Sequence, residues 1–205
     1  MKVYMIRHGQ SESNAKNIHG GWDPSHLTEQ GRADAAVAGK RLEGISFDKV
    51  YTSDLNRAVE TQRIALPDVD AEKSALIREI NVGDLMGTSP KDCLAQYGES
   101  YRQNRCKRDF ADYGGESHAQ LCERVEAFLK SLEDRPYQNV AVFTHGGVIR
   151  STMEVIVKAS FGNTIDSLKC ANCSVFIFEY ADSKWQLDTW NFRSEIQRTI
   201  LEEAT

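Results

Sequence analysis

Short apolar runs alternate along the chain with longer stretches in which polar and apolar positions recur at helical spacing. The short runs predict strands at residues 3–6, 49–52, 140–144 and 174–180, with residues 185–190 returning from the last strand as a hairpin around Asp182-Ser183. The longer stretches predict helices at about residues 28–42, 55–66, 117–132 and 148–159. This alternation favours an α/β fold: a three-layer sandwich with a mostly parallel central sheet flanked by helices.

Nothing in the sequence marks a domain boundary. The 205 residues contain no internal repeat, no low-complexity tract and no linker rich in Pro, Gly or Ser. This length suits one domain with a substantial core, so we expect residues 1–205 to form a single domain. Residues 88–115 interrupt the strand–helix alternation and are rich in charged and aromatic side chains. We expect an irregular insert there that covers the mouth of a site as a lid; a solvated helical excursion is the alternative.

Composition and charge exclude several classes of protein. With 40% hydrophobic and 27% charged residues, the chain matches an ordinary globular protein rather than a disordered or membrane-embedded one. A formal net charge of −5 argues against a nucleic-acid partner, which requires a concentrated basic surface. The first apolar run meets Arg7 before it reaches the length of a signal peptide, and no run has the length of a membrane helix. We therefore expect a cytoplasmic protein without a membrane partner.

The cysteines support the same compartment. Five of them, an odd number, lie without a compact framework, which is typical of reduced thiols. Only Cys170 and Cys173 have the spacing of metal-binding or redox-active cysteines. Without a second pair or a nearby histidine they cannot complete a tetrahedral zinc site, so we expect neither a metal ligand nor a redox pair there.

Two predicted strands end in a histidine followed by glycine. The strand at residues 3–6 leads into Arg7-His8-Gly9, and the strand at residues 140–144 leads into His145-Gly146-Gly147. Because ligands bind at the carboxyl ends of the strands in open α/β sheets, we expect both histidines at one ligand-binding edge. A single Arg-His-Gly tripeptide arises by chance in on the order of one in a hundred chains of this size. The paired placement makes chance a poor explanation.

These residues are part of a longer, ordered set of motifs through which the chain resembles the histidine phosphatase superfamily, the group that includes the cofactor-dependent phosphoglycerate mutases. The motifs are Arg7-His8-Gly9-Gln10-Ser11-Glu12-Ser13-Asn14, Leu27-Thr28-Glu29-Gln30-Gly31, Ser53-Asp54-Leu55-Asn56-Arg57-Ala58-Val59-Glu60-Thr61, Arg78-Glu79-Ile80-Asn81-Val82-Gly83, Gly114-Gly115-Glu116-Ser117 and Thr144-His145-Gly146-Gly147. Their joint order is far more specific than any one motif. The resemblance implies a phosphoglycerate mutase-like fold.

The resemblance also implies roles for single residues. His8 is the nucleophile, which takes the phosphoryl group and forms a phosphohistidine. Glu79 protonates the leaving oxygen. The transferring phosphate is held by cationic and polar side chains: Arg7, Arg57, His145 and Asn14. The implied reaction uses no metal and no cofactor, so the expected enzyme is a metal-independent phosphomonoesterase of the histidine acid phosphatase type.

The chemistry of phosphoryl transfer explains why these residue types are needed. Negative charge spreads over the equatorial oxygens of the phosphoryl group, and without a metal it must be met by fixed cationic donors. An imidazole nucleophile presents one unprotonated nitrogen, so its other nitrogen has to donate to a fixed acceptor such as a backbone carbonyl. Gly9 would let the chain turn sharply beside the His8 ring. A carboxylic acid can protonate the alkoxide leaving group and then activate the water that hydrolyses the phosphohistidine.

Each assignment has a structural alternative. Arg57 lies one turn into a predicted helix, where an ordinary surface cation is common, and Glu79 could pair with the adjacent Arg78. We expect His19 and Gly146 to take part in substrate binding, His19 through the pocket wall and Gly146 through backbone N–H groups at a helix start. A solvated loop histidine and a glycine required for close packing are the alternatives for these two.

Within the superfamily, the motif around Glu79 favours hydrolysis. It reads Arg78-Glu79-Ile80-Asn81, which resembles the phosphatases more than the Asn-Glu-Arg-His-Tyr-Gly-like motif of the mutases. Leu85 and Met86 stand where Trp and Glu are common, so the pocket wall departs from the phosphatase pattern. We expect a phosphomonoester hydrolase acting on a small phosphorylated metabolite. A cofactor-dependent phosphoglycerate mutase is the alternative, and a non-catalytic binder of phosphorylated ligands or phosphoproteins is a third reading.

Overall fold

The structure, a computed structural model, describes residues 1–159 and 169–191. Within these residues six strands form one sheet in the order β3-β2-β4-β1-β5-β6. Their bounds are Lys2–Arg7 (β1), Lys49–Thr52 (β2), Glu72–Lys73 (β3), Asn139–Thr144 (β4), Val175–Ala181 (β5) and Lys184–Thr189 (β6). The first four in this order run parallel, and β5 and β6 are antiparallel additions at one edge. The predicted, mostly parallel sheet is confirmed.

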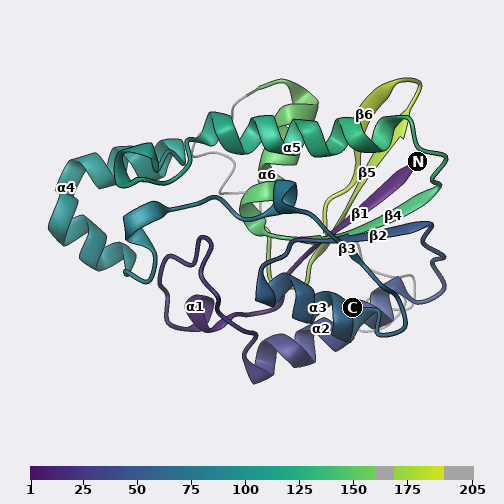
Figure 1. Cartoon of the computed structure of the whole chain (residues 1–205), viewed down its shortest axis with the longest axis horizontal. Helices are drawn as coiled ribbons and strands as arrows, with labels where there is room; N and C mark the ends of the chain where they lie inside the picture. Colours follow the sequence, from purple (N-terminus) through teal and green to yellow (C-terminus); the bar gives the residue numbers. More distant parts are fainter. Residues whose placement is uncertain (160–168, 192–205) are drawn as a thin grey trace, which may run out of the picture.

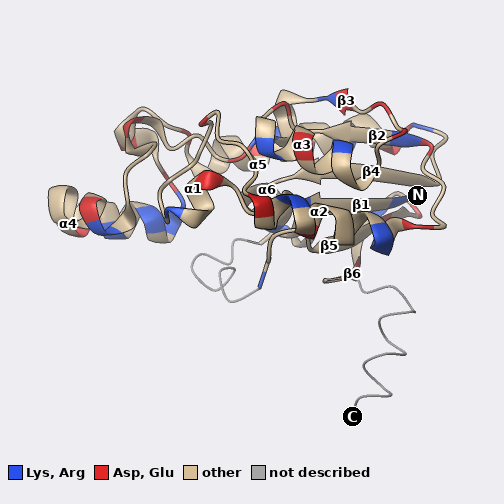
Figure 2. Cartoon of the chain, turned by 90° about the horizontal axis from the view of Figure 1, so that it is seen from below, with Lys and Arg blue, Asp and Glu red and all other residues tan. Residues whose placement is uncertain are grey.

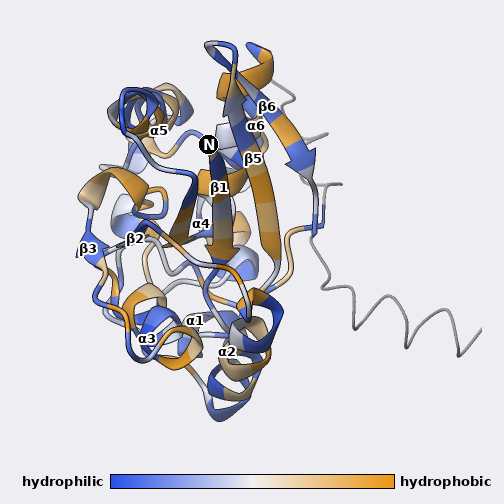
Figure 3. Cartoon of the chain, turned by 90° about the vertical axis from the view of Figure 1, so that its right-hand side faces the viewer, coloured by the Kyte–Doolittle hydropathy of each residue, from blue (hydrophilic) through white to orange (hydrophobic). Residues whose placement is uncertain are grey.

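Helices cover both faces of this sheet (Figure 1). The layers are α2 (Glu29–Leu42) and α3 (Asn56–Ala65) on one face, and α5 (His118–Glu133) and α6 (Gly146–Val157) on the other. Each face of the sheet has its own hydrophobic core, and successive side chains of β1 point into opposite cores. Met5 packs in the core with α5 and α6, whereas Ile6 packs in the core with α2 and α3. Apolar residues accordingly concentrate on the central strands (Figure 3). The three-layer α/β fold is confirmed.

The segment between α3 and α5 is more regular than expected. Residues 90–107 form α4 (Pro90–Lys107), which Ser89 caps and which is interrupted at Gly98, where φ is 56° and ψ is −131°. The irregular conformation expected for these residues was therefore wrong, and the alternative of a helical excursion agrees with the structure; a serine cap followed by proline is itself a helix start signal. Figures 1 and 2 show α4 projecting away from the sheet, at the end of the molecule opposite the N-terminus.

Short helical turns connect the longer elements. They are α1 (Glu12–Ala15) and three 3₁₀ turns, η1 (Ala75–Ile77), η2 (Gly83–Leu85) and η3 (Ala111–Tyr113). At the other end of the chain the hairpin predicted around Asp182-Ser183 is confirmed: β5 and β6 pair antiparallel, and the two turn residues have φ of 51° and 58°. Turns with two positive φ values match the right-handed twist of the strands that they join.

The cysteines do not form a shared site. All five are free, and Cys170 and Cys173 belong to different cores, on opposite faces of the sheet. Burial raises the pKa of Cys170 to about 11 and that of Cys173 to about 12. Thiols with such values are protonated and unreactive at neutral pH. Separately, none of the helices within residues 1–159 and 169–191 combines the length and the hydropathy that a membrane span requires.

Candidate active site

Three strands end side by side at one edge of the sheet. In the parallel pairing of β1 with β4, Arg7 lies opposite Thr144, so the next residues, His8 and His145, leave the sheet together. Their ring centroids are 5.0 Å apart. The neighbouring β2 ends one step earlier on the other side of β4 and delivers Ser53, whose N–H donates to the Phe143 carbonyl at 2.9 Å. The register of the sheet therefore brings the two histidines together, as expected from their positions at strand ends.

His8 is held in one tautomer. Its side chain is buried, and Nδ1 lies 2.7 Å from the carbonyl oxygen of Gly9. A carbonyl oxygen can only accept, so Nδ1 carries the hydrogen and Nε2 keeps its lone pair. Burial and the charges of Arg57 and Arg7 hold the pKa of His8 well below its usual value. The ring is therefore a neutral imidazole that presents Nε2.

Gly9 is needed for a reason other than the one expected. Its φ is not positive, so no sharp left-handed turn occurs there. A Cβ atom at Gly9 would instead lie 2.4 Å from the carbonyl oxygen of Gly31 in α2. The Gly9 N–H donates to Thr61 Oγ1 of α3 at 3.0 Å. Gly9 thus allows the backbone beside His8 to pack directly against α2, which fixes the ring relative to both helices.

His145 uses its two nitrogens in the opposite way. Nε2 lies 2.8 Å from the hydroxyl of Ser53, whereas the buried Nδ1 has no hydrogen-bond partner within the described residues. Burial, followed by the charges of Arg57 and His8, holds the pKa of His145 well below its usual value. A buried ring nitrogen without a partner is costly, because it has lost its water and gained nothing in return. Such an atom marks a place where a ligand can bind.

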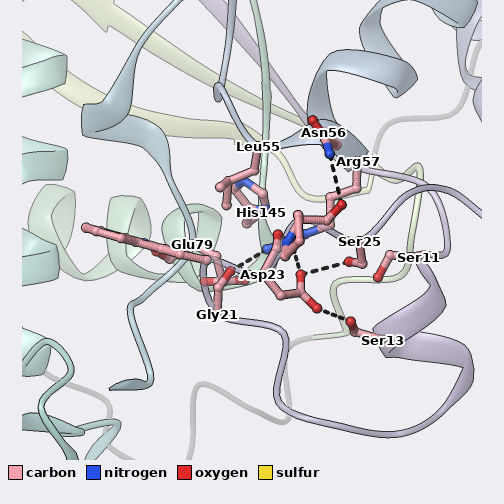
Figure 4. A network of polar contacts seen from close by, with 12 residues as sticks. Ser11, Ser13, Gly21, Asp23, Ser25, Leu55, Asn56, Arg57, Glu79 and His145 are labelled. Atoms are coloured by element: carbon pink, nitrogen blue, oxygen red, sulfur yellow. Dashed lines mark hydrogen bonds and ion pairs between the residues drawn. The ribbon is translucent and has the colours of Figure 1, made fainter. Parts of the chain in front are cut away.

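Arg57 is a buried cation, not a surface one. Its side chain is 3% exposed, and Nη1 forms an ion pair with Asp23 Oδ1 at 2.8 Å. Nη2 donates to the carbonyl of Gly21 at 2.7 Å. The Asp23 carboxylate also accepts from the hydroxyls of Ser13 and Ser25, so it is itself held in place (Figure 4). Burial lowers the pKa of Arg57, and the charges of Glu79 and Asp23 oppose that shift.

Arg7 supplies the second cation beside the histidines. Nη1 donates to the Cys170 carbonyl, while the buried Nε has no partner within the described part of the chain. Gly146, the first residue of α6, packs against this group: a Cβ atom there would lie 3.4 Å from Arg7 Nε. Arg7 and Arg57 both lower the pKa of His8, which places two positive charges around the imidazole. A site of this kind attracts an anion.

Glu79 approaches the same edge from the loop after η1. Its Oε2 accepts from the N–H of Gly147 at 3.2 Å and its Oε1 from the N–H of Ile80 at 3.0 Å. A Cβ atom at residue 147 would lie 2.0 Å from Oε1, so only glycine allows this approach. Arg78 does not pair with Glu79; it donates to Asp54 Oδ1 at 2.6 Å instead. The carboxylate of Glu79 therefore faces the start of α6 rather than a neighbouring arginine.

A second arginine network positions the backbone of Glu79. Arg124 of α5 donates from Nη2 to the Glu79 carbonyl at 2.9 Å, and Trp22 Nε1 donates to the same oxygen at 2.7 Å. Arg124 also forms an ion pair with Glu116 at 2.8 Å. The loop that carries Glu79 is thus tied to α5 on one side and to the Trp22 loop on the other.

Asn14 and His19 lie at different distances from this centre. Asn14 Oδ1 accepts from Asn172 Nδ2 at 3.2 Å, and the same Asn172 group donates to the His8 carbonyl at 2.9 Å, so Asn14 borders the site. His19 Nε2 lies 2.7 Å from the hydroxyl of Tyr101 in α4. Burial, together with the charge of Arg105, lowers the pKa of His19. The structure thus groups His19 with α4, not with the two strand-end histidines.

Four residues to which the sequence analysis gave no role complete the arrangement. They are Ser53, Asp23, Arg124 and Asn172. Ser53 could have been found from the sequence, because it follows a predicted strand as His8 and His145 do. The other three lie on loops or on a helix far along the chain, and no local pattern distinguishes them. Within the described residues, no set of three metal-ligating side chains gathers at this edge.

Comparison with known sequences decides the family. Residues 3–193 match the model of the histidine phosphatase superfamily (branch 1). The chain belongs to the histidine phosphatase superfamily. A Parvibaculum lavamentivorans protein named 2,3-bisphosphoglycerate-dependent phosphoglycerate mutase is 34% identical over 191 residues, which cover 88% of this chain and 90% of the relative. A Bartonella tribocorum protein of the same name is 36% identical, with 74% of this chain and 79% of the relative covered.

Solved structures share the fold of this chain. Bacillus stearothermophilus YhfR superimposes with a TM-score of 0.85 at 26% identity and covers 95% of this chain and 98% of its own. A mycobacterial glucosyl-3-phosphoglycerate phosphatase, solved in complex with VO3, superimposes with a TM-score of 0.83 at 25% identity, with 93% and 98% covered. This superfamily member is therefore similar in sequence to proteins named as mutases and similar in structure to a protein named as a phosphatase.

Proposed function

We propose that this enzyme hydrolyses small phosphomonoesters through a phosphohistidine formed at Nε2 of His8. The observation that carries the proposal is the pairing of two neutral imidazoles between Arg7 and Arg57. Two buried nitrogens at this position, Nε of Arg7 and Nδ1 of His145, have no partner within the described residues. A phosphoryl group beside His8 would supply acceptors for both.

The residues present support both halves of the reaction. In the first, the lone pair of His8 Nε2 attacks phosphorus, the P–O bond to the alcohol breaks, and Glu79 in its acid form gives its proton to the departing oxygen. In the second, Glu79 takes a proton from water as the water oxygen attacks phosphorus. The N–P bond then breaks, its electron pair returns to Nε2, and phosphate leaves. Glu79 ends protonated, so every proton is accounted for.

Cationic and polar side chains would hold the charge of the phosphoryl group. With the Ser53 hydroxyl donating to Nε2 of His145, Nδ1 carries a hydrogen and can donate to a phosphate oxygen. A dianion beside His145 also favours its protonated form, which strengthens that bond. Arg57, Asn14 and the free N–H of Gly146 at the start of α6 supply further donors. We propose that these groups serve in place of a metal.

Hydrolysis is favoured over phosphate redistribution by the motif around Glu79 and by the structural similarity to a named phosphatase. The names of the sequence relatives favour the mutase, which is the second candidate. The two activities differ in the acceptor of the phosphoryl group: water in a hydrolase, a phosphoglycerate in a mutase. Incubation with 3-phosphoglycerate and 2,3-bisphosphoglycerate distinguishes them. We expect release of inorganic phosphate; rapid formation of 2-phosphoglycerate would establish the mutase.

The phosphohistidine is tested with an aryl phosphate in the presence of a metal chelator. We expect turnover by the native enzyme, and rapid acid-free quenching should trap an acid-labile, base-stable phosphoenzyme. His8→Ala should show neither, whereas His26→Ala, which alters an exposed histidine paired with Glu60, should show both. Loss of activity in the chelator would contradict the metal-independent reaction, and an active His8→Ala enzyme would contradict the nucleophile.

The role of Glu79 is tested by varying the leaving group. Nitrophenolate departs without a proton, whereas the alkoxide of a sugar phosphate requires one. We therefore expect Glu79→Gln to reduce kcat on an alkyl phosphate by about 10²–10⁴-fold, the range for a general acid, and to reduce phosphoenzyme formation from nitrophenyl phosphate far less. Equal losses on both substrates would contradict the proton-donor role.

The α4 segment is proposed to border the leaving-group side of the site. The loop that carries His19 contacts Tyr101, and Arg105 acts electrostatically on the same histidine. Residues 88–115 thus adjoin a loop that also carries Gly21 and Asp23, the partners of Arg57. Hydrolysis rates across sugar phosphates, phosphoglycerates and nucleoside monophosphates, measured for native enzyme and His19→Ala, test this placement. We expect the ranking of substrates to change in the variant.

A further inference from the structure

A second cluster of reactive side chains lies where α5 and α6 meet. His118 and Cys122 stand one helical turn apart on α5, and Glu154 faces them from α6. His118 Nε2 lies 2.8 Å from Glu154 Oε2 and 3.5 Å from Cys122 Sγ. One ligand atom from each of the three lies within 4.8 Å of the others. An imidazole, a thiol and a carboxylate are the ligand types that Zn²⁺ selects.

This cluster is separate from the proposed active site. Glu154 follows Gly146 by eight residues in α6, which places it about 12 Å further along the helix axis. The Glu154 side chain is only 3% exposed, whereas that of His118 is 17% exposed, so solvent reaches the cluster from the α5 side. The metal-independent reaction proposed for His8 is compatible with a metal site here.

Arg108 holds the position that a metal cation would take. Its Nη2 lies 2.9 Å from His118 Nε2 and donates to Glu154 as well. Nε and Nη1 of the same guanidinium are buried without a partner within the described residues. The backbone of Arg108 has a φ of 54°, an unfavourable value for a residue other than glycine. The guanidinium is therefore an incompletely satisfied cation beside two of the three ligand atoms, His118 Nε2 and Glu154 Oε2, where another cation can replace its charge.

We propose that His118, Cys122 and Glu154 form a binding site for a thiophilic divalent cation of the Zn²⁺ class, which displaces the guanidinium of Arg108. The site then has three protein ligands and one open position for water, as other three-ligand zinc sites do. Arg108 balances only the charge of Glu154. A divalent cation balances a carboxylate and a thiolate together, so Cys122 binds after its proton has passed to water.

The same residues do not form a nucleophile triad. In such a triad the histidine contacts the nucleophile through one nitrogen and the carboxylate through the other. Here Nε2 of His118 is the nearer nitrogen to Cys122 Sγ, at 3.5 Å against 3.9 Å for Nδ1, and is also the nitrogen that contacts Glu154. The geometry of His118, Cys122 and Glu154 therefore fits a metal site better than a nucleophile triad.

Metal binding would also act on α4. Arg108 directly follows the last residue of α4, so its bond to Glu154 ties the end of that helix to α6. A cation that binds Glu154 breaks this ion pair and releases the end of α4 from α6. The site would then couple the metal to the segment that borders the leaving-group side.

Titration with Co²⁺ tests the proposal on the full chain, because a cobalt–thiolate bond absorbs in the near ultraviolet and four-coordinate cobalt absorbs strongly in the visible. We expect the native chain to bind one Co²⁺ with both absorptions, and excess Zn²⁺ to abolish them. Cys122→Ser should remove the thiolate absorption, whereas Cys106→Ser, a half-buried cysteine of α4, should leave it unchanged. Arg108→Gln should bind Co²⁺ about tenfold or more tightly, since a competing positive charge is gone.

Three outcomes would overturn the site. The first is an unchanged absorption in Cys122→Ser. The second is an affinity in Arg108→Gln equal to that of the native chain. The third is no binding by the native chain, which would make the cluster an ion-pair network that fastens α4. Thermal unfolding of each variant shows whether it folds, and the spectra do not depend on enzyme activity.

Discussion

The ends of β1 and β4 carry the same short pattern, a strand followed by His and Gly. The two histidine rings nevertheless face a ligand with different nitrogens, Nε2 in His8 and Nδ1 in His145. At the end of β1, the Gly9 carbonyl lies against Nδ1 of His8, so the lone pair of the neutral ring is on Nε2. At the end of β4, the Ser53 hydroxyl lies against Nε2 of His145, and Nδ1 has no hydrogen-bond partner among residues 1–159 and 169–191. The sheet register places both rings at the same edge, 5.0 Å apart. The partner of the second nitrogen, not the strand-end position, sets what each ring can do.

This contrast supports the proposal that His8 attacks the phosphoryl group and that His145 binds it. A carbonyl is an acceptor only, so the neutral His8 ring carries its hydrogen on Nδ1 and its lone pair on Nε2, and the lowered pKa keeps the ring neutral. A hydroxyl both donates and accepts, so His145 can change its protonation when an anion arrives. The first environment suits a nucleophile, because the neutral ring has its lone pair on Nε2. The second suits a donor that strengthens as negative charge approaches.

The largest effect is expected from removing the attacking ring. His8→Ala should lower kcat by at least about 10⁴-fold, as losses of an essential nucleophile do. The phosphoenzyme should be undetectable by quench with labelled substrate. The folded state should persist, because the ring is buried against a polar edge rather than within either core. A variant that keeps a tenth of native activity would show that His8 does not attack.

Removing the His145 ring should lower kcat less than removing the His8 ring does. His145→Ala should lower kcat by about 10²–10³-fold, the usual loss of one donor to a developing anion. The phosphoenzyme should still form, only more slowly, in a single-turnover experiment. If the variant instead lost the phosphoenzyme altogether while remaining folded, His145 rather than His8 would be the candidate for the covalent step.

Ser53→Ala sharpens the comparison by removing only the partner of His145. The loss of one hydrogen bond, about 1 kcal/mol, corresponds to a fall in kcat of about five- to tenfold. Ser131→Ala, which removes a serine side-chain hydrogen bond on α5 remote from the site, is the matched control and should leave kcat unchanged. Equal effects of the two changes would mean that Ser53 does not orient His145.

The smallest effect concerns stability against pH. Burial and nearby arginines hold the pKa of His8 and His145 well below the value near 6.5 that they have when unfolded. Below about pH 6.5 the unfolded chain therefore binds protons that the folded chain does not. The free energy of unfolding should fall with decreasing pH, by up to about 1.4 kcal/mol per pH unit for each histidine. Urea unfolding of native enzyme and His8→Asn at pH 7 and pH 5.5 measures this; identical slopes would contradict the shift at His8.

Much of the fold was predictable because its signals are local. Four helices and five strands follow from hydrophobic spacing, and Asp182-Ser183 was recognisable as a turn from its two short polar residues. The two-residue strand β3 was missed, since a strand of exposed Glu72 and Lys73 carries no apolar signal. For α4 the sequence offered a helix only as the alternative to an irregular insert, because its residues are largely polar on all sides, with only Cys93 and Tyr101 buried.

The sequence by itself determined which chemical groups are present and that two histidines follow strands at one edge of the sheet, since strand periodicity and motif order are properties of neighbouring residues. Only the tertiary structure decided their states. Asp23 meets Arg57 across 34 positions, and Ser53 meets His145 across 92. Hydrogen-bond partners and burial set the tautomer and the pKa of a ring, and both arise from residues far apart in the chain.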